Sequence, residues 1–284
     1  MQVIHAEDYK EILEMALTED IGSGDVTSLS VVPENANCAG VIFTKEAAMV
    51  CGAQIARETF LQVDPAIQVT VLIPDGQMAR AGQEVIRLSG PARGILTAER
   101  TALNFLQHLS GVATETRRYV DKIAGTHARL LDTRKTLPGW RKLHKYAVAC
   151  GGGTNHRMGL HDLVLIKDNH LKLMNRHTPG DFSAAVARAR SLYPALKIEI
   201  EAETPDEVRQ ALAAGADIIL LDNMTCDQMR DCVAFCAGRA KLEASGGVTL
   251  DTVAQIAQTG VDFISVGALT HSVRAIDFSL ELEL

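Results

Sequence analysis

Side chains that bind anions follow apolar runs in the middle of the chain. The triplet Thr133-Arg134-Lys135 comes directly after ARLLD, and Lys167 follows LVLI. The pair His156-Arg157 stands between these two segments. Arginine binds carboxylates and phosphates through two parallel N–H donors, and lysine adds a compact positive charge. These residues therefore predict a site for an acid or a phosphate.

A second set of polar or small residues follows the later apolar runs. Glu201 comes after LKIEI, and Asp222 comes after DIILL. Carboxylates of this kind bind sugar hydroxyls or Mg²⁺. Small residues follow KLEA and end DFISV: Ser245, Gly246, Gly247, Val266, Gly267 and Ala268. Backbone N–H groups at such positions, just before helices, suit a phosphate group, so this set predicts a sugar phosphate as the second ligand.

The elements that position these residues alternate along the chain. Six short, continuous apolar runs alternate with helical patterns, which indicates parallel strands buried on both faces. The helices are expected at about 139–150, 182–192, 205–214, 225–237 and 249–259. Six such units favour an α/β barrel over an open sheet, and no GxGxxG follows a strand. Barrel enzymes carry their chemistry at the carboxyl ends of the strands, where these polar residues stand.

The first third of the chain has a different pattern. Helices are predicted at Asp8–Thr18 and Ala53–Leu61, with short alternating segments separated by turns rich in Gly, Pro and Asp. This predicts a small α+β domain. Two further helical patterns, Thr97–Leu109 and Thr114–Ala124, lead into the alternating part.

Composition and charge exclude some classes of protein. Hydrophobic residues make up 47% and charged residues 22%, as in globular proteins. The net charge of -7 disfavours nucleic acid as a partner. Residues 99–176 nevertheless hold 14 Lys and Arg against 6 Asp and Glu, which is consistent with a local anion site. No apolar stretch of about 20 residues predicts a membrane span, and no signal-peptide pattern starts the sequence, so we expect a cytoplasmic protein.

Residue chemistry alone leaves alternatives open. Lys167 at a strand end is also suited to form a Schiff base in an aldolase. His161 and His170 flank the same strand and are conceivable metal ligands, although we favour ordinary polar roles. Cys232 and Cys236 are one helical turn apart, and we expect buried thiols there.

The sequence resembles a known family. The run LLDTRKTLPGWRKLHKYAVACGGGTNHRMGLHDLVLIKDNH, residues 130–170, is similar to the signature region of the quinolinate phosphoribosyltransferases. The resemblance continues through EDIGSGDVTS, LTAERTALNFLQHLSGVAT, IEIEAET, GADIILLDN, LEASGGV and VDFISVGALTHS. These segments together cover nearly the whole chain.

The resemblance implies a fold and an assembly. It implies an N-terminal α+β sandwich domain over residues 1–110 and an incomplete, TIM-like α/β barrel with fewer than eight complete units over 111–269. The tail, from about 270 to 284, is expected to pack back on the first domain. The resemblance also implies a homodimer with shared active sites.

The resemblance implies an activity and residue roles. The substrates would be quinolinate and phosphoribosyl pyrophosphate, and the products nicotinate mononucleotide, pyrophosphate and CO₂, in NAD biosynthesis. Catalytic roles fall to Lys135, Glu201 and Asp222, of which the two carboxylates would also bind Mg²⁺, mainly through the pyrophosphate substrate. The substrate-binding residues would be Arg100 (from the partner subunit), Thr133, Arg134, Lys135, His156, Arg157, Lys167, Glu201, Asp222, Ser245, Gly246, Gly247, Val266, Gly267 and Ala268. The alternatives are a related protein associated with molybdate transport, the Schiff-base aldolase, and a non-catalytic sensor of phosphate ligands.

Overall fold

A computed structural model describes residues 4–174 and 181–283 of the chain. The chain forms two compact units. Unit 1 contains the described residues up to Arg117, together with Thr136–Gly153 and the segment from Ala268 onward. Unit 2 contains Arg118–Lys135 and Thr154–Gly267.

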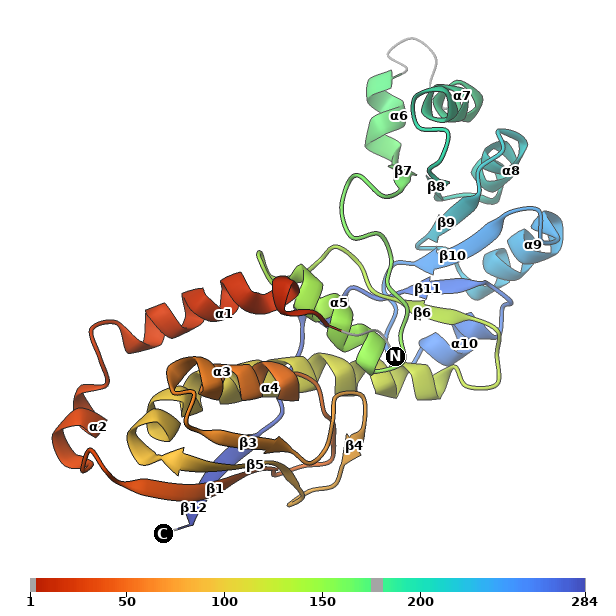
Figure 1. The fold of residues 1–284 in the computed structure, drawn as a ribbon. Helices are drawn as coiled ribbons and strands as arrows, with labels where there is room; N and C mark the ends of the chain where they lie inside the picture. Colours follow the sequence, from red (N-terminus) through yellow and green to blue (C-terminus); the bar gives the residue numbers. More distant parts are fainter. Residues whose placement is uncertain (1–3, 175–180, 284) are drawn as a thin grey trace. The chain divides into compact units, whose positions relative to one another are not determined.

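Unit 1 is built on a four-stranded antiparallel sheet with the order β12-β1-β5-β3 (Figure 1). Its strands are β1 (Asn37–Thr44), β3 (Gln68–Val71), β5 (Glu84–Pro91) and β12 (Phe278–Glu283). A short antiparallel pair joins β2 (Ala48–Met49) to β4 (Met78–Ala79). From Ile86 to Ser89 the residues of β5 are alternately buried and exposed, because successive side chains of a strand point to opposite faces.

Unit 1 also contains α1 (Ala6–Ile21), α2 (Val26–Val31), α3 (Ala53–Val63), most of α4 (Ala92–Lys122), α5 (Arg141–Cys150) and the short α11 (Ala268–His271). In Figure 1, α3 and α4 lie over the sheet, and their apolar residues join one buried cluster that includes Phe60 and Leu103.

One helix replaces the two that the sequence predicts between 97 and 124. Helix α4 runs without a break through Ser110 and Gly111. The glycine is needed for packing, because a Cβ at position 111 would meet the carbonyl oxygen of Arg274 and the side chain of Val273. The prediction of two separate helices was therefore wrong.

The boundary between the units differs from a single cut after residue 110. Helix α5 (Arg141–Cys150), which the sequence assigned to the barrel, groups with unit 1. The hydroxyl of Tyr146 donates to the buried Asp75 carboxylate at 2.9 Å, and Lys142 forms an ion pair with Asp8 at 2.9 Å. The last strand also belongs here, because β12 pairs antiparallel with β1.

A histidine pair, with His144 buried and His108 half-buried, joins α4 to α5. The Nε2 atoms of His108 and His144 lie 2.8 Å apart, and His108 contacts the Trp140 ring edge-on. Burial, with a smaller effect of the His108 charge, lowers the pKa of His144 to about 4. One ring must therefore donate to the other as neutral imidazole.

This pair predicts acid sensitivity. Because the folded pKa of His144 lies below its usual 6.5, its contribution to stability is present above about pH 6.5 and is lost as the pH falls toward 4. We expect the free energy of unfolding to fall by up to about 3 kcal/mol over that window through this group. Urea unfolding at several pH values measures this free energy. The His144→Gln substitution should flatten the slope of the free energy of unfolding against pH. The exposed His127→Gln is the control, and an unchanged slope in His144→Gln contradicts the assignment.

Unit 2 is a six-stranded parallel sheet with the order β6-β11-β10-β9-β8-β7. Its strands are β6 (Arg129–Leu131), β7 (Val164–Ile166), β8 (Ile198–Ala202), β9 (Ile218–Asp222), β10 (Lys241–Ser245) and β11 (Phe263–Ser265). Strands β6 and β7 form the two edges, so six strands make an incomplete barrel. The predicted fold class, an α+β domain followed by an incomplete α/β barrel, is confirmed.

The helices of unit 2 lie on the outside of its sheet (Figure 1). They are α6 (Asp168–Met174), α7 (Phe182–Leu192), α8 (Pro205–Ala213), α9 (Cys226–Cys236) and α10 (Val253–Ala257). Thr204 and Thr225 cap α8 and α9 by accepting the backbone N–H three residues on, as their sequence positions predict. Helix α6 was not predicted from the sequence.

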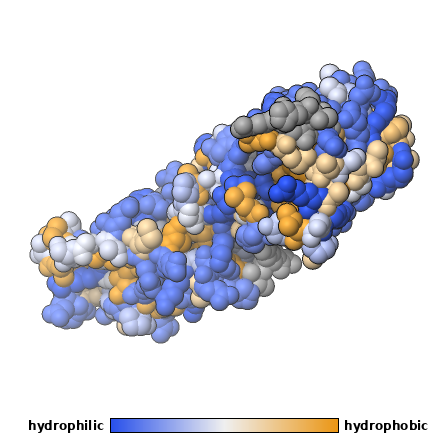
Figure 2. Space-filling view, turned by 90° about the horizontal axis from the view of Figure 1, so that it is seen from above, coloured by the Kyte–Doolittle hydropathy of each residue, from blue (hydrophilic) through white to orange (hydrophobic). Residues whose placement is uncertain are grey.

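The surface seen in Figure 2 is mostly hydrophilic, with smaller apolar areas between. Among the described residues, no helix is both long and apolar enough to cross a membrane.

Candidate active site

Most of the predicted site residues lie at the carboxyl ends of the parallel strands of unit 2. Thr133, Arg134 and Lys135 follow β6, Lys167 follows β7, Glu201 lies in β8, and Asp222 and Ser245 end β9 and β10. Gly246 and Gly247 follow β10, and Val266 and Gly267 follow β11. Two residues lie elsewhere: Arg100 is exposed on α4 of unit 1, and Ala268 begins α11.

Strand register places the acceptors on one face of the sheet. Ser245 pairs with Asp222, and Glu201 pairs with Leu220, two residues before Asp222. Paired residues of parallel strands point to the same face, and so do residues two apart along one strand. Glu201, Asp222 and Ser245 therefore share a face.

His156 and Arg157 reach the same region because the chain just before them pairs with the backbone of β6. Thr154 forms a parallel bridge with Leu131, and its N–H donates to the Leu130 carbonyl at 2.8 Å. The N–H of His156 then donates to the buried Asp132 carboxylate at 2.7 Å. These bonds place the segment after Thr154 beside the end of β6.

Three of the predicted cations line one pocket. Arg134, Arg157 and Lys167 contribute to the wall of a cavity of about 770 Å³, together with apolar residues of β7, α6 and α7. Burial and the neighbouring charge of Arg134 lower the pKa of Arg157 below its usual value. Two guanidinium groups this close repel each other, and a dianion between them would remove that repulsion. The pocket therefore suits a ligand with two carboxylates and an apolar body.

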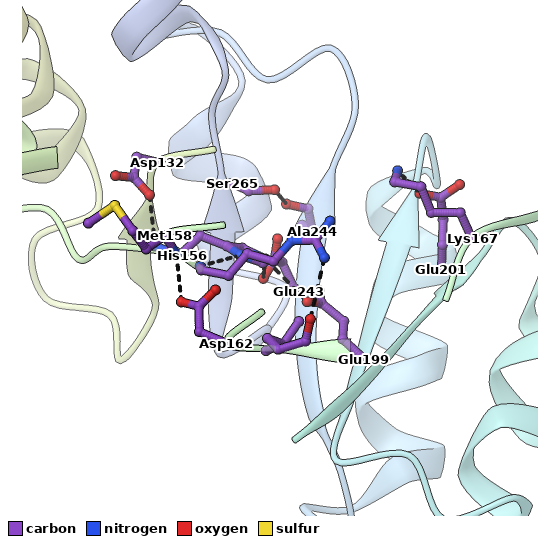
Figure 3. A network of polar contacts seen from close by, with 12 residues as sticks. Asp132, His156, Met158, Asp162, Lys167, Glu199, Glu201, Glu243, Ala244 and Ser265 are labelled. Carbon is purple, nitrogen blue, oxygen red and sulfur yellow. Dashed lines mark hydrogen bonds and ion pairs between the residues drawn. The ribbon is translucent and has the colours of Figure 1, made fainter. Parts of the chain in front are cut away.

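Lys167 connects this pocket to the acceptor set. Its Nζ donates to Oε2 of Glu201 at 2.5 Å, as Figure 3 shows. The lysine side chain is 46% exposed and the glutamate 11%, so the pair opens toward solvent on the lysine side. A carboxylate ligand at Lys167 would therefore lie next to the Glu201 carboxylate.

The loop after β10 has room only for glycine at its first position. Gly246 has φ +95°, and a Cβ there would lie 2.6 Å from Cγ of Asn223 and 2.9 Å from its backbone nitrogen. Asn223 in turn donates through Nδ2 to Oδ2 of Asp222 at 2.9 Å, and through its N–H to the Ser245 carbonyl at 2.9 Å. Asn223 therefore connects the turn at Gly246 with the Asp222 carboxylate.

A deeper polar layer lies below the strand ends. Glu199 in β8 and Glu243 in β10 stand two residues before Glu201 and Ser245, and so face the same way about 7 Å deeper. Both are buried, with 0% and 1% exposure. Nε2 of His156 lies 3.2 Å from Oε2 of Glu199 and 3.5 Å from Oε2 of Glu243 (Figure 3).

The charges of this layer are coupled. Burial and then the charge of Glu199 raise the pKa of Glu243 to about 8. Burial lowers the pKa of His156, but the contact with Glu199 and the charges of Glu243, Glu199 and Asp132 outweigh it, so that this pKa is raised. The N–H of Arg157 donates to Nδ1 of His156 at 2.7 Å, and this bond opposes a second ring proton. While the hydrogen bond from the Arg157 N–H to Nδ1 holds, the neutral His156 ring carries its proton on Nε2.

Asp132, Glu199 and Glu243 were missed in the sequence analysis. They lie inside the runs ARLLD, LKIEI and KLEA, which were interpreted as plain buried strands. An acidic residue within a continuous apolar strand was the available signal, because burial of a carboxylate requires a partner.

The fold and the charged side chains at the carboxyl ends of its strands are typical of one class of protein, the α/β-barrel enzymes that act on anionic substrates. Two family models cover nearly the whole chain: Quinolinate phosphoribosyl transferase, N-terminal domain, matches residues 25–110, and its C-terminal domain matches 112–281. The chain belongs to the quinolinate phosphoribosyltransferase family.

Relatives agree over almost the full length. The chain is 41% identical to the probable nicotinate-nucleotide pyrophosphorylase [carboxylating] of Bacillus subtilis, over 97% of this chain and 93% of the relative. The solved structure of the nicotinate-nucleotide pyrophosphorylase from Francisella tularensis is 41% identical, with a TM-score of 0.93, and covers 99% of this chain and 98% of its own. That of the Ehrlichia chaffeensis enzyme is 37% identical, with a TM-score of 0.92, and covers all of both chains.

Proposed function

We propose that this protein transfers the phosphoribosyl group of phosphoribosyl pyrophosphate to quinolinate and releases nicotinate mononucleotide, pyrophosphate and CO₂, as a step of NAD biosynthesis. The observation that carries the proposal is the pocket with Arg134, Arg157 and Lys167 in its wall, in a member of this family. Quinolinate has two adjacent carboxylates on an apolar ring, which is the ligand that this lining suits.

The sugar phosphate would bind beside this pocket. Glu201 and Asp222 would accept the ribose hydroxyls, and the loops at 245–247 and 266–268 would hold the 5′-phosphate through backbone N–H groups. Lys135, which follows Thr133 in the loop after β6, would neutralise the leaving pyrophosphate. No observation favours an aldolase or a transport-associated protein once the family is known.

The chemistry then follows from these positions. The quinolinate nitrogen attacks C1 of the ribose as the C1–O bond to pyrophosphate breaks. The anionic side chains of Glu201 and Asp222 stabilise the positive charge that develops on the ribose. Decarboxylation leaves an electron pair that the adjacent pyridinium nitrogen stabilises, and a proton from solvent completes the product. No protein nucleophile is required, so positioning and exclusion of water supply much of the acceleration.

The acceptor set also fits a magnesium ion. Among the described residues, Lys167 donates to one oxygen of Glu201, and Asn223 donates to one oxygen of Asp222. The other oxygen of each carboxylate is left for a ligand. Mg²⁺ typically binds one or two carboxylates together with substrate phosphates. When bound, the ion would neutralise charge on the pyrophosphate leaving group.

We further propose a homodimer that works in the cytoplasm. The six cysteines are free thiols, four of them buried, which is typical of a reducing compartment. In the proposed dimer, Arg100 of one subunit would complete the carboxylate site of the other. Arg100 is exposed on α4 and is available for such a contact.

Subunit mixing tests the shared site. Arg100→Ala and Asp222→Asn subunits should each be nearly inactive alone, and their heterodimers should regain up to about half of wild-type activity, since one of the two sites per dimer is then intact. Tagged heterodimers, purified and assayed, measure this. If verified heterodimers stay inactive, the shared site is contradicted.

Acceptor choice tests the function itself. Titration calorimetry should give quinolinate at least about tenfold tighter binding than nicotinate, which lacks the second carboxylate, because one lost charged contact costs roughly 1.5–3 kcal/mol. Equal affinities, in protein with a normal unfolding transition, would remove the reason for assigning a dicarboxylate substrate.

A further inference from the structure

Asn223 has a left-handed backbone at the end of β9. Its φ is +55°, and among the described residues other than glycine only Ala237, with φ +47°, also has a positive φ. Ala237 ends helix α9, where a left-handed residue is ordinary. Asn223 instead stands between β9 and α9, directly after Asp222. Such residues cost energy and persist where the surrounding contacts hold them, which is common at functional sites.

This backbone brings the Asn223 side chain to the Asp222 carboxylate. In an extended strand, neighbouring side chains point to opposite faces, so these two would point apart. Here Nδ2 of Asn223 donates to Oδ2 of Asp222 at 2.9 Å. Asparagine is one of the few residues that tolerate a left-handed backbone, and its amide is a donor for the carboxylate. One residue type therefore meets both requirements.

The same residue is packed on the loop after β10. The N–H of Asn223 donates to the Ser245 carbonyl at 2.9 Å. A Cβ at Gly246 would overlap Oδ1 of Asn223 and lie 2.6 Å from its Cγ, so the amide covers the Cα of this glycine. Ser245 and Asp222 are paired in adjacent strands. Asn223 therefore fixes the carboxylate and the loop relative to each other.

We infer that Asn223 is a positioning residue for phosphoribosyl transfer, which holds the Asp222 carboxylate for the ribose and couples it to the loop that binds the 5′-phosphate. This inference deepens the proposed function and rests on it. The amide occupies Oδ2 of Asp222 and leaves Oδ1 for a ribose hydroxyl or a metal ion. Asn223 acts through Asp222 and Gly246, and neither contact requires it to touch a substrate.

Two replacements separate the side chain of Asn223 from its backbone. Asn223→Gly removes the amide and adopts a positive φ without strain, and Asn223→Asp keeps the shape but replaces the donor with a carboxylate. Each should lower kcat/KM for phosphoribosyl pyrophosphate about tenfold or more, because a hydrogen bond to a charged group is lost. Calorimetry should show quinolinate affinity changed by less than about twofold.

Ala237→Gly is the matched control, because it replaces the other left-handed residue away from the strand ends. Its kcat/KM should stay within about twofold of the wild-type value. If Asn223→Gly keeps wild-type activity, only the backbone conformation matters and the inference is overturned. An equal loss of quinolinate affinity in that variant would also overturn it.

A double-mutant cycle tests the contact without an activity assay. Gly246→Ala should lower the unfolding temperature, because the new methyl group overlaps the Asn223 side chain. In the Asn223→Gly background the same substitution should cause at most about half of that shift, since only the backbone contact remains. The control, Gly215→Ala, should cause the same shift in both backgrounds, because nothing lies within 4 Å of its Cβ.

Equal shifts for Gly246→Ala in the two backgrounds would overturn the inference. If the wild-type protein forms no nicotinate mononucleotide, the proposed function fails instead, and the unfolding cycle still shows whether Asn223 holds the loop.

Discussion

Arg157→Met is expected to raise the KM for quinolinate by about 10² to 10³-fold, with a smaller effect on kcat. The substitution keeps an unbranched apolar side chain in the pocket wall but removes the guanidinium group. A carboxylate of the substrate then enters without its partner, at a cost of about 3–4 kcal/mol. Arg157→Lys should recover part of the loss, because it restores the charge without the bidentate geometry. Steady-state kinetics with varied quinolinate measures both variants.

The control for this prediction is Arg188→Met. Arg188 is exposed on α7 and lines the same pocket, but no role is assigned to it. Its replacement should change the KM for quinolinate by less than about threefold. A KM unchanged in Arg157→Met, or one raised equally in both variants, would show that the pocket does not bind the dicarboxylate through Arg157.

Gly246→Ala is expected to lower kcat/KM for phosphoribosyl pyrophosphate by about 10²-fold or more, with quinolinate binding largely kept. The new methyl group would collide with the side chain and the backbone nitrogen of Asn223. Asn223 must move, and with it the hydrogen bond to Asp222 and the turn that would hold the phosphate. Kinetics with varied phosphoribosyl pyrophosphate, beside calorimetry with quinolinate, measures the two effects separately.

Gly215→Ala is the matched control. Gly215 also has a positive φ, +83°, but a Cβ there would meet nothing within 4 Å. Both substitutions therefore share the backbone cost of about 1 kcal/mol, and only Gly246→Ala disturbs Asn223. If the two variants lose the same activity, general destabilisation explains the result and the loop has no special role.

Periodicity was enough to predict the architecture, and packing explains where it failed. Continuous apolar runs alternating with helices are typical of a parallel sheet, and all six strands formed. The continuity of α4 through Gly111 and the grouping of α5 with unit 1 could not be predicted from local sequence. Gly111 is needed for contact with the distant Arg274, and α5 joins unit 1 through partners such as Asp75.

The site was predictable at the strand ends and much less so beneath them. A charged residue just after an apolar run is visible in a sequence, and the structure brings Arg134, Arg157 and Lys167 to one pocket. Glu199 and Glu243 are visible only as interruptions of apolar strands. Their meaning depends on register between β8, β9 and β10, and on the ring of His156, which is distant in sequence.

The most direct test of the central claim is product formation by the purified protein. We predict that quinolinate and phosphoribosyl pyrophosphate with Mg²⁺ yield nicotinate mononucleotide and CO₂ in equal amounts, and that chelation of Mg²⁺ stops both. Chromatography and carboxyl-labelled quinolinate follow the two products. If folded protein that binds both substrates forms neither product, the proposed activity is contradicted.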